Sequence, residues 1–268
     1  MSYEFLNLER DDQVAVITLN RPQTLNSLNK GLQEDINAAS EEIFNDDSVR
    51  AVILTGAGRG FCSGADLSGR GGARGEQSGP PPQNSRLDQM GWVGRLAMSV
   101  YEIGVPSIAA MNGVAAGAGM SIALGCDMRV GSVNSRFKTV FAERALSPDS
   151  GMSFFLPRLI GYGRAADLIF TNRGIDGEEA YRLGLLDRLV EPDEVLTTAM
   201  EVARQVASLP PMAIRAGKRV LQQNMSLDFH DALRNETVGL GYAGRAPNDR
   251  VEQAAAFMEK RPGKFTGT

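Results

Sequence analysis

Runs of apolar residues, separated by turn-forming residues, divide the first part of the chain into strands and a helix. The segments VAVITL at 14–19 and AVILT at 51–55 are rich in β-branched residues and predict buried strands. Between them, apolar residues recur every three or four positions over 29–44, which predicts an amphipathic helix. Strand, helix and strand in this order form a βαβ unit, which places ligand sites at the carboxyl ends of its strands.

The stretch from Ser107 to Asp127 joins an apolar strand to an apolar helix almost entirely through glycine and alanine. SIAAM at 107–111 predicts a buried strand, and the apolar run from Ala118 predicts a buried helix that begins just after Gly117. Small side chains leave backbone N–H groups open to a ligand at a helix start, where the dipole is positive. The joint predicts a site for an anion or a developing oxyanion, although glycine and alanine equally serve close packing.

Two further segments are rich in glycine. The loop after the strand at 51–55 begins with GAG at 56–58, but Phe61 occupies the third glycine position of a dinucleotide-binding fingerprint, so a dinucleotide site is not expected. Residues 68–86 combine Gly, Pro and polar residues without an apolar period, and they predict a mobile surface loop over a site.

The rest of the chain changes from mixed α/β to helical character. The pattern predicts short strands at 128–131 and 137–140, and helices at 87–102, 148–160, 164–171, 177–183, 193–209, 211–224, 227–239 and 247–261. The order Ser147, Pro148, Asp149 is typical of an N-cap, a first helical position and a first-turn acid, and it sets the expected start of the helix at 148–160. We expect a core over residues 1–190 and a C-terminal helical region over 191–268.

Composition narrows the class of protein. The 268 residues are 43% hydrophobic and 22% charged with a formal net charge of -4, which gives no reason to expect nucleic acid or a membrane as partner. Cys62 and Cys126 lie in apolar surroundings and fit a reducing compartment. One histidine, His230, cannot form a histidine metal cluster, so no metal is expected. The N-terminus has early charges and no apolar signal segment, so we expect a cytoplasmic protein.

Five segments in order, over most of the chain, resemble the crotonase superfamily of enoyl-CoA hydratases and isomerases. They are LNRPQTLNSL at 19–28, GAGRGFCSGADL at 56–67, NGVAAGAGMSIALGCD at 112–127, FKTVFAERALSPDSG at 137–151 followed by LPRLIGYGRA, and FMEKRPGKF at 257–265. The resemblance implies an α/β fold, a spiral of repeated ββα units, which replaces a doubly wound sheet as the expected topology. It also implies that the C-terminal helices make trimer contacts, in a homotrimer or a dimer of trimers.

The family holds the thioester carbonyl of an acyl-CoA between two backbone N–H groups and thereby stabilises an enolate. By resemblance these donors are the N–H groups of Ala65 and Ala118. The residues that the resemblance places along the CoA and acyl groove are Leu25, Asn26, Ser27, Leu28, Ala65, Asp66, Leu67, Gly117 and Phe141. No cofactor is implied beyond the CoA of the substrate.

Phe257 and Lys260 match family residues that reach the adenine end of CoA in a neighbouring subunit. An apolar ring and a cation together suit this end of CoA, where the cation can pair with a nucleotide phosphate. A lysine in the last turn of a helix is also common for electrostatic reasons, and the sequence favours neither interpretation.

Hydratases of the family use two glutamates to hold and split a water molecule. The matching positions carry Ser121 and Phe141, so both carboxylates are absent and simple hydration is disfavoured. Glu143 lies two positions further on and is expected to be a surface acid.

Isomerases of the superfamily that shift a 3-enoyl double bond to the 2-enoyl position, and relatives acting on ring-opened phenylacetyl-CoA derivatives, carry an acid directly after the proline that is Pro148 here. Asp149 is therefore expected to be the acid and base of an isomerase, because one carboxylate suffices to move a proton from C2 to C4. Apolar neighbours such as Phe141 and Phe155 are expected to raise its pKa. Without the resemblance, a helix first-turn acid is the simpler interpretation.

Four alternatives stay open. An enoyl-CoA hydratase is the first. A thioesterase is the second, because Ser121, Asp149 and His230 follow the chain order of α/β-hydrolases and Ser121 lies in a segment close to G-x-S-x-G, although inside the predicted helix. A dehalogenase relative uses an Asp at the same site as a nucleophile, but no histidine lies near the loop to serve as its base. The last is an acyl-CoA-binding protein without turnover.

Overall fold

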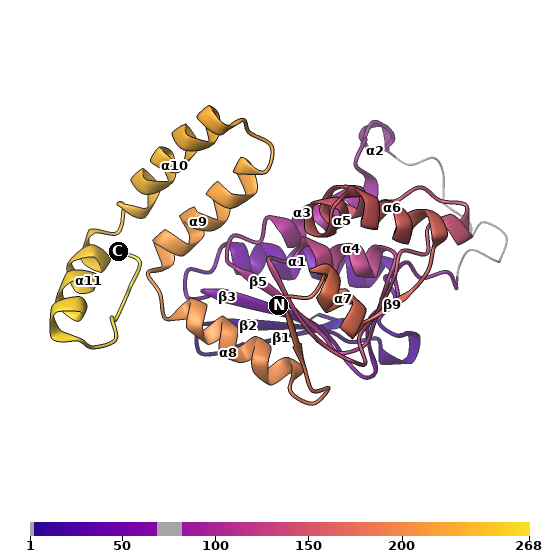
Figure 1. Cartoon of the computed structure of the whole chain (residues 1–268), viewed down its shortest axis with the longest axis horizontal. Coiled ribbons are helices and arrows are strands. Elements are labelled where there is room, and N and C mark those ends of the chain that lie inside the picture. The colour runs from indigo at the N-terminus through magenta and orange to yellow at the C-terminus, as the bar shows by residue number, and fades with distance from the viewer. Residues whose placement is uncertain (1–2, 69–81) are drawn as a thin grey trace.

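The computed structural model describes residues 3–68 and 82–268. The predicted loop at 68–86 falls mostly outside these ranges, and its described end forms a short helix, α2 (Gln83–Arg86). Two sheets form the centre of the molecule and helices surround them, while the last three helices extend away from it (Figure 1).

The first sheet has six strands in the order β1-β2-β3-β5-β7-β10, of which only β1 runs antiparallel to its neighbour. Its strands are β1 (Leu6–Asp11), β2 (Val14–Leu19), β3 (Ala51–Gly56), β5 (Ser107–Met111), β7 (Met128–Ser132) and β10 (Arg188–Val190). The strands predicted at 14–19, 51–55 and 107–111 are therefore confirmed. β1 and β10 were missed because both are partly exposed and carry charged residues.

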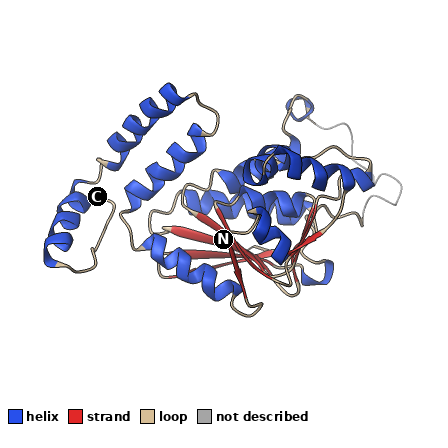
Figure 2. Cartoon of the chain, in the orientation of Figure 1, coloured by secondary structure: helices blue, strands red, loops and turns tan. Residues whose placement is uncertain are grey.

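Alternate residues of the central strands belong to two separate apolar cores. Val52 and Leu54 of β3 pack in the core on the side of α1 (Lys30–Phe44), whereas Ala51 and Ile53 pack on the side of α8 (Val195–Ala207). Figure 2 shows helices on both sides of the strands. Side chains on a strand point alternately to its two faces. Both faces are covered here, so the sequences of these strands are continuous apolar runs.

The second sheet has four strands in the order β4-β6-β8-β9. They are β4 (Gly60–Cys62), β6 (Val114–Ala116), β8 (Arg136–Lys138) and β9 (Ile175–Asp176). Each strand β3, β5 and β7 of the first sheet is followed in the chain by a strand of the second sheet and then by a helix. This is the expected spiral of ββα units.

The remaining helices follow the predicted pattern with one important exception. They are α3 (Gly91–Tyr101), α4 (Ala118–Gly125), α5 (Met152–Ile160), α6 (Tyr162–Thr171), α7 (Gly177–Leu183), α9 (Pro211–Asn224), α10 (Phe229–Ala243) and α11 (Pro247–Glu259). The exception is α5, which begins at Met152 and not at Pro148. Ser150 and Gly151 have φ values of 52° and 85°, in the left-handed region, so α5 cannot extend back through them to Pro148.

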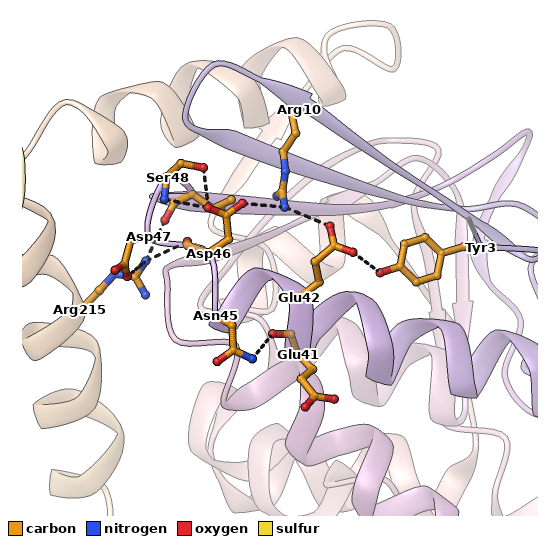
Figure 3. A network of polar contacts seen from close by, with 10 residues as sticks. Tyr3, Arg10, Glu41, Glu42, Asn45, Asp46, Asp47, Ser48 and Arg215 are labelled. Carbon is orange, nitrogen blue, oxygen red and sulfur yellow. Dashed lines mark hydrogen bonds and ion pairs between the residues drawn. The ribbon is translucent and has the colours of Figure 1, made fainter. Parts of the chain in front are cut away.

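The helices α9, α10 and α11 form an arm that projects from the rest of the chain (Figure 1). Two basic residues of α9 join the arm to the core. Lys218 donates hydrogen bonds to Asp127 Oδ2 at 2.8 Å and to the Val105 carbonyl at 2.9 Å. Arg215 donates to the Val49 carbonyl at 3.0 Å and, as Figure 3 shows, lies beside the loop that follows α1. The boundary at residue 190 stays a prediction, and α8, which follows it, packs on the first sheet.

The arm exposes many apolar side chains. The most exposed ones on its helices are Leu221, Phe229, Leu240, Val251, Phe257 and Met258. Among the described residues, no helix is both long and apolar enough to cross a membrane.

Candidate active site

The loop after β4 presents an open backbone donor at Ala65. Leu28 and Ala65 form a parallel bridge, in which the Leu28 N–H donates to the Gly64 carbonyl at 2.8 Å and the Asp66 N–H donates to the Leu28 carbonyl at 3.1 Å. In a parallel bridge of this kind, the N–H group of the bridged residue itself points the other way. The Ala65 N–H thus has no acceptor among the described residues.

The second donor is at the start of α4. Gly117 precedes the helix with a φ of 50°, a conformation that favours glycine, and a Cβ atom there would lie 2.9 Å from the Val140 side chain. Its own N–H donates to the Lys138 carbonyl at 3.0 Å. The N–H of Ala118 is at the first helical position, where no carbonyl of the helix can accept it. The positive end of the helix dipole adds to its attraction for an oxyanion.

The two donors are brought together by close backbone packing. A Cβ atom on Gly64, which has a φ of 92°, would lie 2.6 Å from the Ala116 carbonyl oxygen and 3.6 Å from the Ala118 nitrogen. A Cβ atom on Gly119 would lie 2.2 Å from the Cys62 carbonyl oxygen. Only glycine permits this approach of the β4 loop to α4, and the approach places Ala65 and Ala118 at one cavity.

This cavity has a volume of about 440 Å³ and a mainly apolar lining. It is lined by Ser63, Gly64, Ala65, Leu67, Trp92, Ala116, Gly117, Ala118, Val140, Phe141, Arg144, Leu146 and Asp149. The structure therefore brings together five residues that the sequence predicted for the site, Ala65, Leu67, Gly117, Ala118 and Phe141, with the predicted acid Asp149. We refer to it below as the acyl cavity.

Asp149 reaches the acyl cavity from the loop before α5, and not from the first turn of that helix. The Asp149 carbonyl accepts hydrogen bonds from the Met152 N–H at 2.9 Å and from the buried Ser121 hydroxyl at 3.2 Å. Its Oδ1 accepts a hydrogen bond from the Ser150 hydroxyl at 2.9 Å. The interpretation of Asp149 as a first-turn acid stabilised by the helix dipole is therefore wrong, and the backbone contacts hold its side chain at the cavity.

Arg144 is a site residue that sequence reasoning missed. It belongs to a 3₁₀ turn at Ala142–Arg144 and lines the acyl cavity. Its neighbour Glu143 is directed elsewhere, because its carboxylate accepts hydrogen bonds from Lys138 at 2.7 Å and from Asn172 at 2.8 Å. These contacts lower the pKa of Glu143, with the Lys138 hydrogen bond as the main cause. Glu143 is the surface acid that the sequence suggested.

A second cavity of about 410 Å³ adjoins the acyl cavity, and Ala65 and Trp92 line both. Its other lining residues are Arg21, Leu28, Asn29, Lys30, Gln33, Asp66 and Ser68, and we call it the polar cavity. Asp66 accepts hydrogen bonds from the Ser68 hydroxyl at 2.6 Å and its N–H at 3.0 Å, and forms an ion pair with Arg21 at 2.8 Å. The Ser68 bonds, followed by Arg21, hold the pKa of Asp66 well below its usual range.

Three residues predicted for the CoA groove do not line either cavity. Asn26 is fully buried, and its amide donates to the Ala57 and Gly60 carbonyls at 3.0 and 2.8 Å. Leu25 has a φ of 52°, and Ser27 is buried. In this chain, Asn26 therefore has a structural role: it holds the glycine-rich loop in place.

Phe257 and Lys260 lie at the end of α11, in the arm. The Phe257 side chain is 75% exposed. Neither residue lines the acyl cavity or the polar cavity of its own chain. Their role toward the CoA of a neighbouring subunit stays a prediction.

The geometry also bears on the hydrolase alternative. Ser121 lies inside α4 with no solvent exposure, and its hydroxyl donates to the Gly117 and Asp149 carbonyls at 3.3 and 3.2 Å. His230 is exposed in the first turn of α10, in the arm, where its ring contacts Phe229. A catalytic serine needs an exposed hydroxyl beside its base, and the two residues do not meet this requirement.

Within residues 3–68 and 82–268, no group of three or more His, Cys, Asp or Glu side chains could hold a metal ion. Cys62 and Cys126 are free and buried, and burial raises the pKa of each thiol to about 12.

Comparisons with known proteins agree with this architecture. Residues 9–268 match the family described as enoyl-CoA hydratase/isomerase. A short-chain-enoyl-CoA hydratase from Clostridium acetobutylicum is 38% identical over 256 residues, which are 95% of this chain and 94% of the relative. A 1,2-epoxyphenylacetyl-CoA isomerase from Escherichia coli is 32% identical over 264 residues, which are 98% of this chain and 99% of the relative.

Solved structures show the same fold. The crystal structure of an enoyl-CoA hydratase from Bacillus anthracis matches with a TM-score of 0.90 and 32% identity, over 99% of this chain and 100% of the other. The predicted crotonase-like fold is thereby confirmed. Because the family match, the relatives and the fold agree over nearly the whole length, this chain belongs to the enoyl-CoA hydratase/isomerase family, the crotonase superfamily.

Proposed function

We propose that the protein isomerises 3-enoyl-CoA thioesters to 2-enoyl-CoA thioesters, with the N–H groups of Ala65 and Ala118 as an oxyanion hole and Asp149 as the acid and base. The observation that carries this proposal is the lining of the acyl cavity. It combines two open backbone donors with one carboxylate, Asp149, among the described residues.

The reaction needs one proton to leave and one to return. The thioester oxygen accepts hydrogen bonds from Ala65 and Ala118, which makes the C2 proton more acidic. Asp149 removes that proton, and the electrons of the C2–H bond form a dienolate whose charge is held by the two donors. The protonated Asp149 then returns a proton to C4, which places the double bond between C2 and C3 and restores the carboxylate.

The backbone donors and the carboxylate are expected to contribute to the rate by different amounts. Loss of one oxyanion-hole donor in other enzymes costs about 3–4 kcal/mol of transition-state stabilisation. Loss of a general acid or base costs a factor of about 100 to 10,000 in rate. Asp149 is therefore the residue whose replacement separates binding from chemistry most cleanly.

The test is to replace Asp149 with Asn and to measure isomerisation of a 3-enoyl-CoA together with CoA-ester binding. Asn preserves the shape of the side chain but cannot carry the proton, so we expect turnover to fall by a factor of about 100 to 10,000 with binding nearly unchanged. Glu143→Gln is the matched control and should keep wild-type turnover, because its carboxylate lies outside the acyl cavity. Wild-type turnover in Asp149→Asn, with unchanged melting, would falsify the assignment.

Hydration is the second candidate, since relatives such as those from Clostridium acetobutylicum and Syntrophomonas wolfei are named hydratases. Two carboxylates are needed to hold and split water, and the positions that match them carry the buried Ser121 and Phe141. We expect slow or no conversion of crotonyl-CoA to 3-hydroxybutyryl-CoA. A rate like that of an ordinary hydratase, reproduced with highly purified protein, would make hydration the function.

We further propose that acyl-CoA is the only small-molecule partner the reaction needs and that the protein assembles as a trimer or a dimer of trimers. The exposed apolar side chains of α10 and α11 support an assembly through the arm, because large exposed apolar patches on soluble proteins mark interaction surfaces. Lys260 would then serve the CoA of a neighbouring subunit. Sedimentation that shows a monomer at micromolar concentration would overturn this assembly.

A further inference from the structure

We propose that Arg144 binds a carboxylate on the acyl part of the substrate, so that the preferred substrates are CoA thioesters of acyl chains that end in a second carboxylate. The inference rests on the proposed function in one respect, because that function places the acyl chain in the cavity with Asp149.

A short, fixed turn holds Arg144 at the acyl cavity. The backbone N–H groups of Arg144 and Leu146 both donate to the Phe141 carbonyl at 3.0 Å. Ala145 follows Arg144 with a φ of 55° and reverses the chain direction. Phe141 is 4% exposed, so the turn is anchored on a buried residue of the cavity wall.

The guanidinium of Arg144 has no ion-pair partner among the described residues. Glu143, the nearest acid in sequence, is held by Lys138 and Asn172. Asp149 accepts a hydrogen bond from Ser150 and is the acid of the proposed reaction. Arg144 is exposed at the cavity, so its donors are open to a polar group of a ligand.

The position of Arg144 assigns it to the acyl side of the thioester. Ala65 lines both cavities, so a thioester held at its N–H has the acyl cavity on one side and the polar cavity on the other. The polar cavity has cations of its own, of which Lys30 is 88% exposed and suits the phosphates of CoA, whereas Arg21 is paired with Asp66. Arg144 lines the acyl cavity and not the polar cavity, so it is available to the acyl chain.

A carboxylate is the group that this arrangement favours. The planar guanidinium offers two parallel N–H donors that match the two oxygens of a carboxylate, and such charge-assisted pairs are roughly twice as strong as neutral hydrogen bonds. A chain that carries the carboxylate at its end can pass Asp149 near the thioester and still reach the rim of the cavity, where Arg144 is exposed to solvent.

The test compares the binding of saturated CoA thioesters in pairs of equal chain length, measured by calorimetry. The pairs are adipoyl-CoA with hexanoyl-CoA, suberoyl-CoA with octanoyl-CoA and sebacoyl-CoA with decanoyl-CoA. We expect the wild type to bind the dicarboxylic member about tenfold more tightly for at least one pair. Arg144→Gln should reduce that ratio to about one and change the affinity for the monocarboxylic member less than twofold.

Two further variants separate charge from structure. Arg144→Lys keeps the charge but not the fork of donors, and should retain part of the preference. Arg164→Gln removes an exposed arginine of α6 that does not line the acyl cavity, and should leave every ratio unchanged.

The inference is overturned if the wild type shows no preference in any of the three pairs, or if the preference survives in Arg144→Gln. Saturated thioesters cannot be isomerised, so this result is independent of the chemistry. If the preference is found but no 3-enoyl-CoA is turned over, the carboxylate site stands and the proposed isomerase function fails.

Discussion

The Ser121 hydroxyl donates a hydrogen bond to the Asp149 carbonyl at 3.2 Å, which connects the helix that carries one proposed oxyanion-hole donor to the loop that carries the proposed acid. Ser121→Ala removes this connection without leaving a large cavity. We expect about 1 kcal/mol of lost stability and a loss of isomerase turnover of no more than about tenfold, because other contacts also hold the Asp149 loop. Thermal unfolding and steady-state kinetics measure the two effects.

The same variant tests the thioesterase alternative. If Ser121 were a nucleophile, Ser121→Ala would abolish thioester hydrolysis, and His230→Ala would do the same. Hydrolysis that is absent in the wild type, or equal in all three proteins, excludes this role for Ser121.

Gly64→Ala should disrupt the proposed oxyanion hole. The new Cβ would lie 2.6 Å from the Ala116 carbonyl oxygen, and a φ of 92° is strained for any residue with a Cβ. The loop that bears Ala65 must move away from Ala118, and the loss of one donor predicts a fall in kcat on the order of 100 to 1,000-fold.

Gly163→Ala is the matched control for Gly64→Ala. It lies in α6, no atom lies within 4 Å of its added Cβ, and its φ is not in the left-handed region. This variant should melt at or slightly above the wild-type temperature with unchanged kcat, since alanine favours the helix. Equal effects of the two substitutions on kcat would contradict the proposed geometry.

Asp66 should make stability depend on pH in the acid range. Its folded-state pKa lies below the ordinary value of 3.8, chiefly because of the Ser68 hydrogen bonds and then Arg21. A group with a lowered pKa stabilises the fold above its unfolded pKa and loses that contribution as pH falls. The difference in unfolding free energy between wild type and Asp66→Asn should therefore be largest at neutral pH and should shrink below about pH 4.

Urea unfolding at several pH values between 7 and 3 measures this difference. Ser68→Ala removes the main cause of the shift, so the stability that Asp66 contributes at neutral pH should be smaller in that variant and should change less as the pH falls to 3. A difference between wild type and Asp66→Asn that is constant over the whole range would show that Asp66 has no such role.

Lys218→Met should loosen the junction between the arm and the core. The Lys218 side chain is 5% exposed, and its removal leaves Asp127, 28% exposed, with hydrogen bonds from the Ser107 N–H and hydroxyl but without its cation. We expect a loss of about 3 kcal/mol in unfolding free energy. Lys30→Met, which removes an 88% exposed lysine paired with Glu34, should change it by less than about 0.5 kcal/mol. Equal losses in the two variants would show that the buried pair has no special importance.

Local patterns predicted the elements that local residues determine. The strands at 14–19, 51–55 and 107–111 were found because both faces are buried, and the helix at 29–44 was found because its apolar stripe is regular. The strands β4 and β6 were not predicted. Each has three residues, and pairing between distant segments decides their conformation.

The site was predicted unevenly for a similar reason. The small residues around Gly117 predicted an open backbone donor at a helix start, and the structure places Ala118 at the acyl cavity, where the backbone at Gly64 packs closely against it. The order Ser147, Pro148, Asp149 imitates a helix start, but left-handed residues at 150 and 151 delay the helix. Arg144 carries no local signal, because the turn at Phe141 and Ala145 alone brings it to the acyl cavity.

The two open donors of the acyl cavity come from the main chain. Main-chain groups and side-chain groups of the site therefore respond differently to substitution. Substituting the side chain at Ala65 or Ala118 does not delete an N–H group, whereas substituting Asp149, Ser121 or Phe141 changes which proton transfers are available. Mutation can therefore exchange one reaction for another while the ability to hold an enolate persists. The proposed oxyanion donors thus depend on the course of the main chain, and a few side chains determine which reaction can follow.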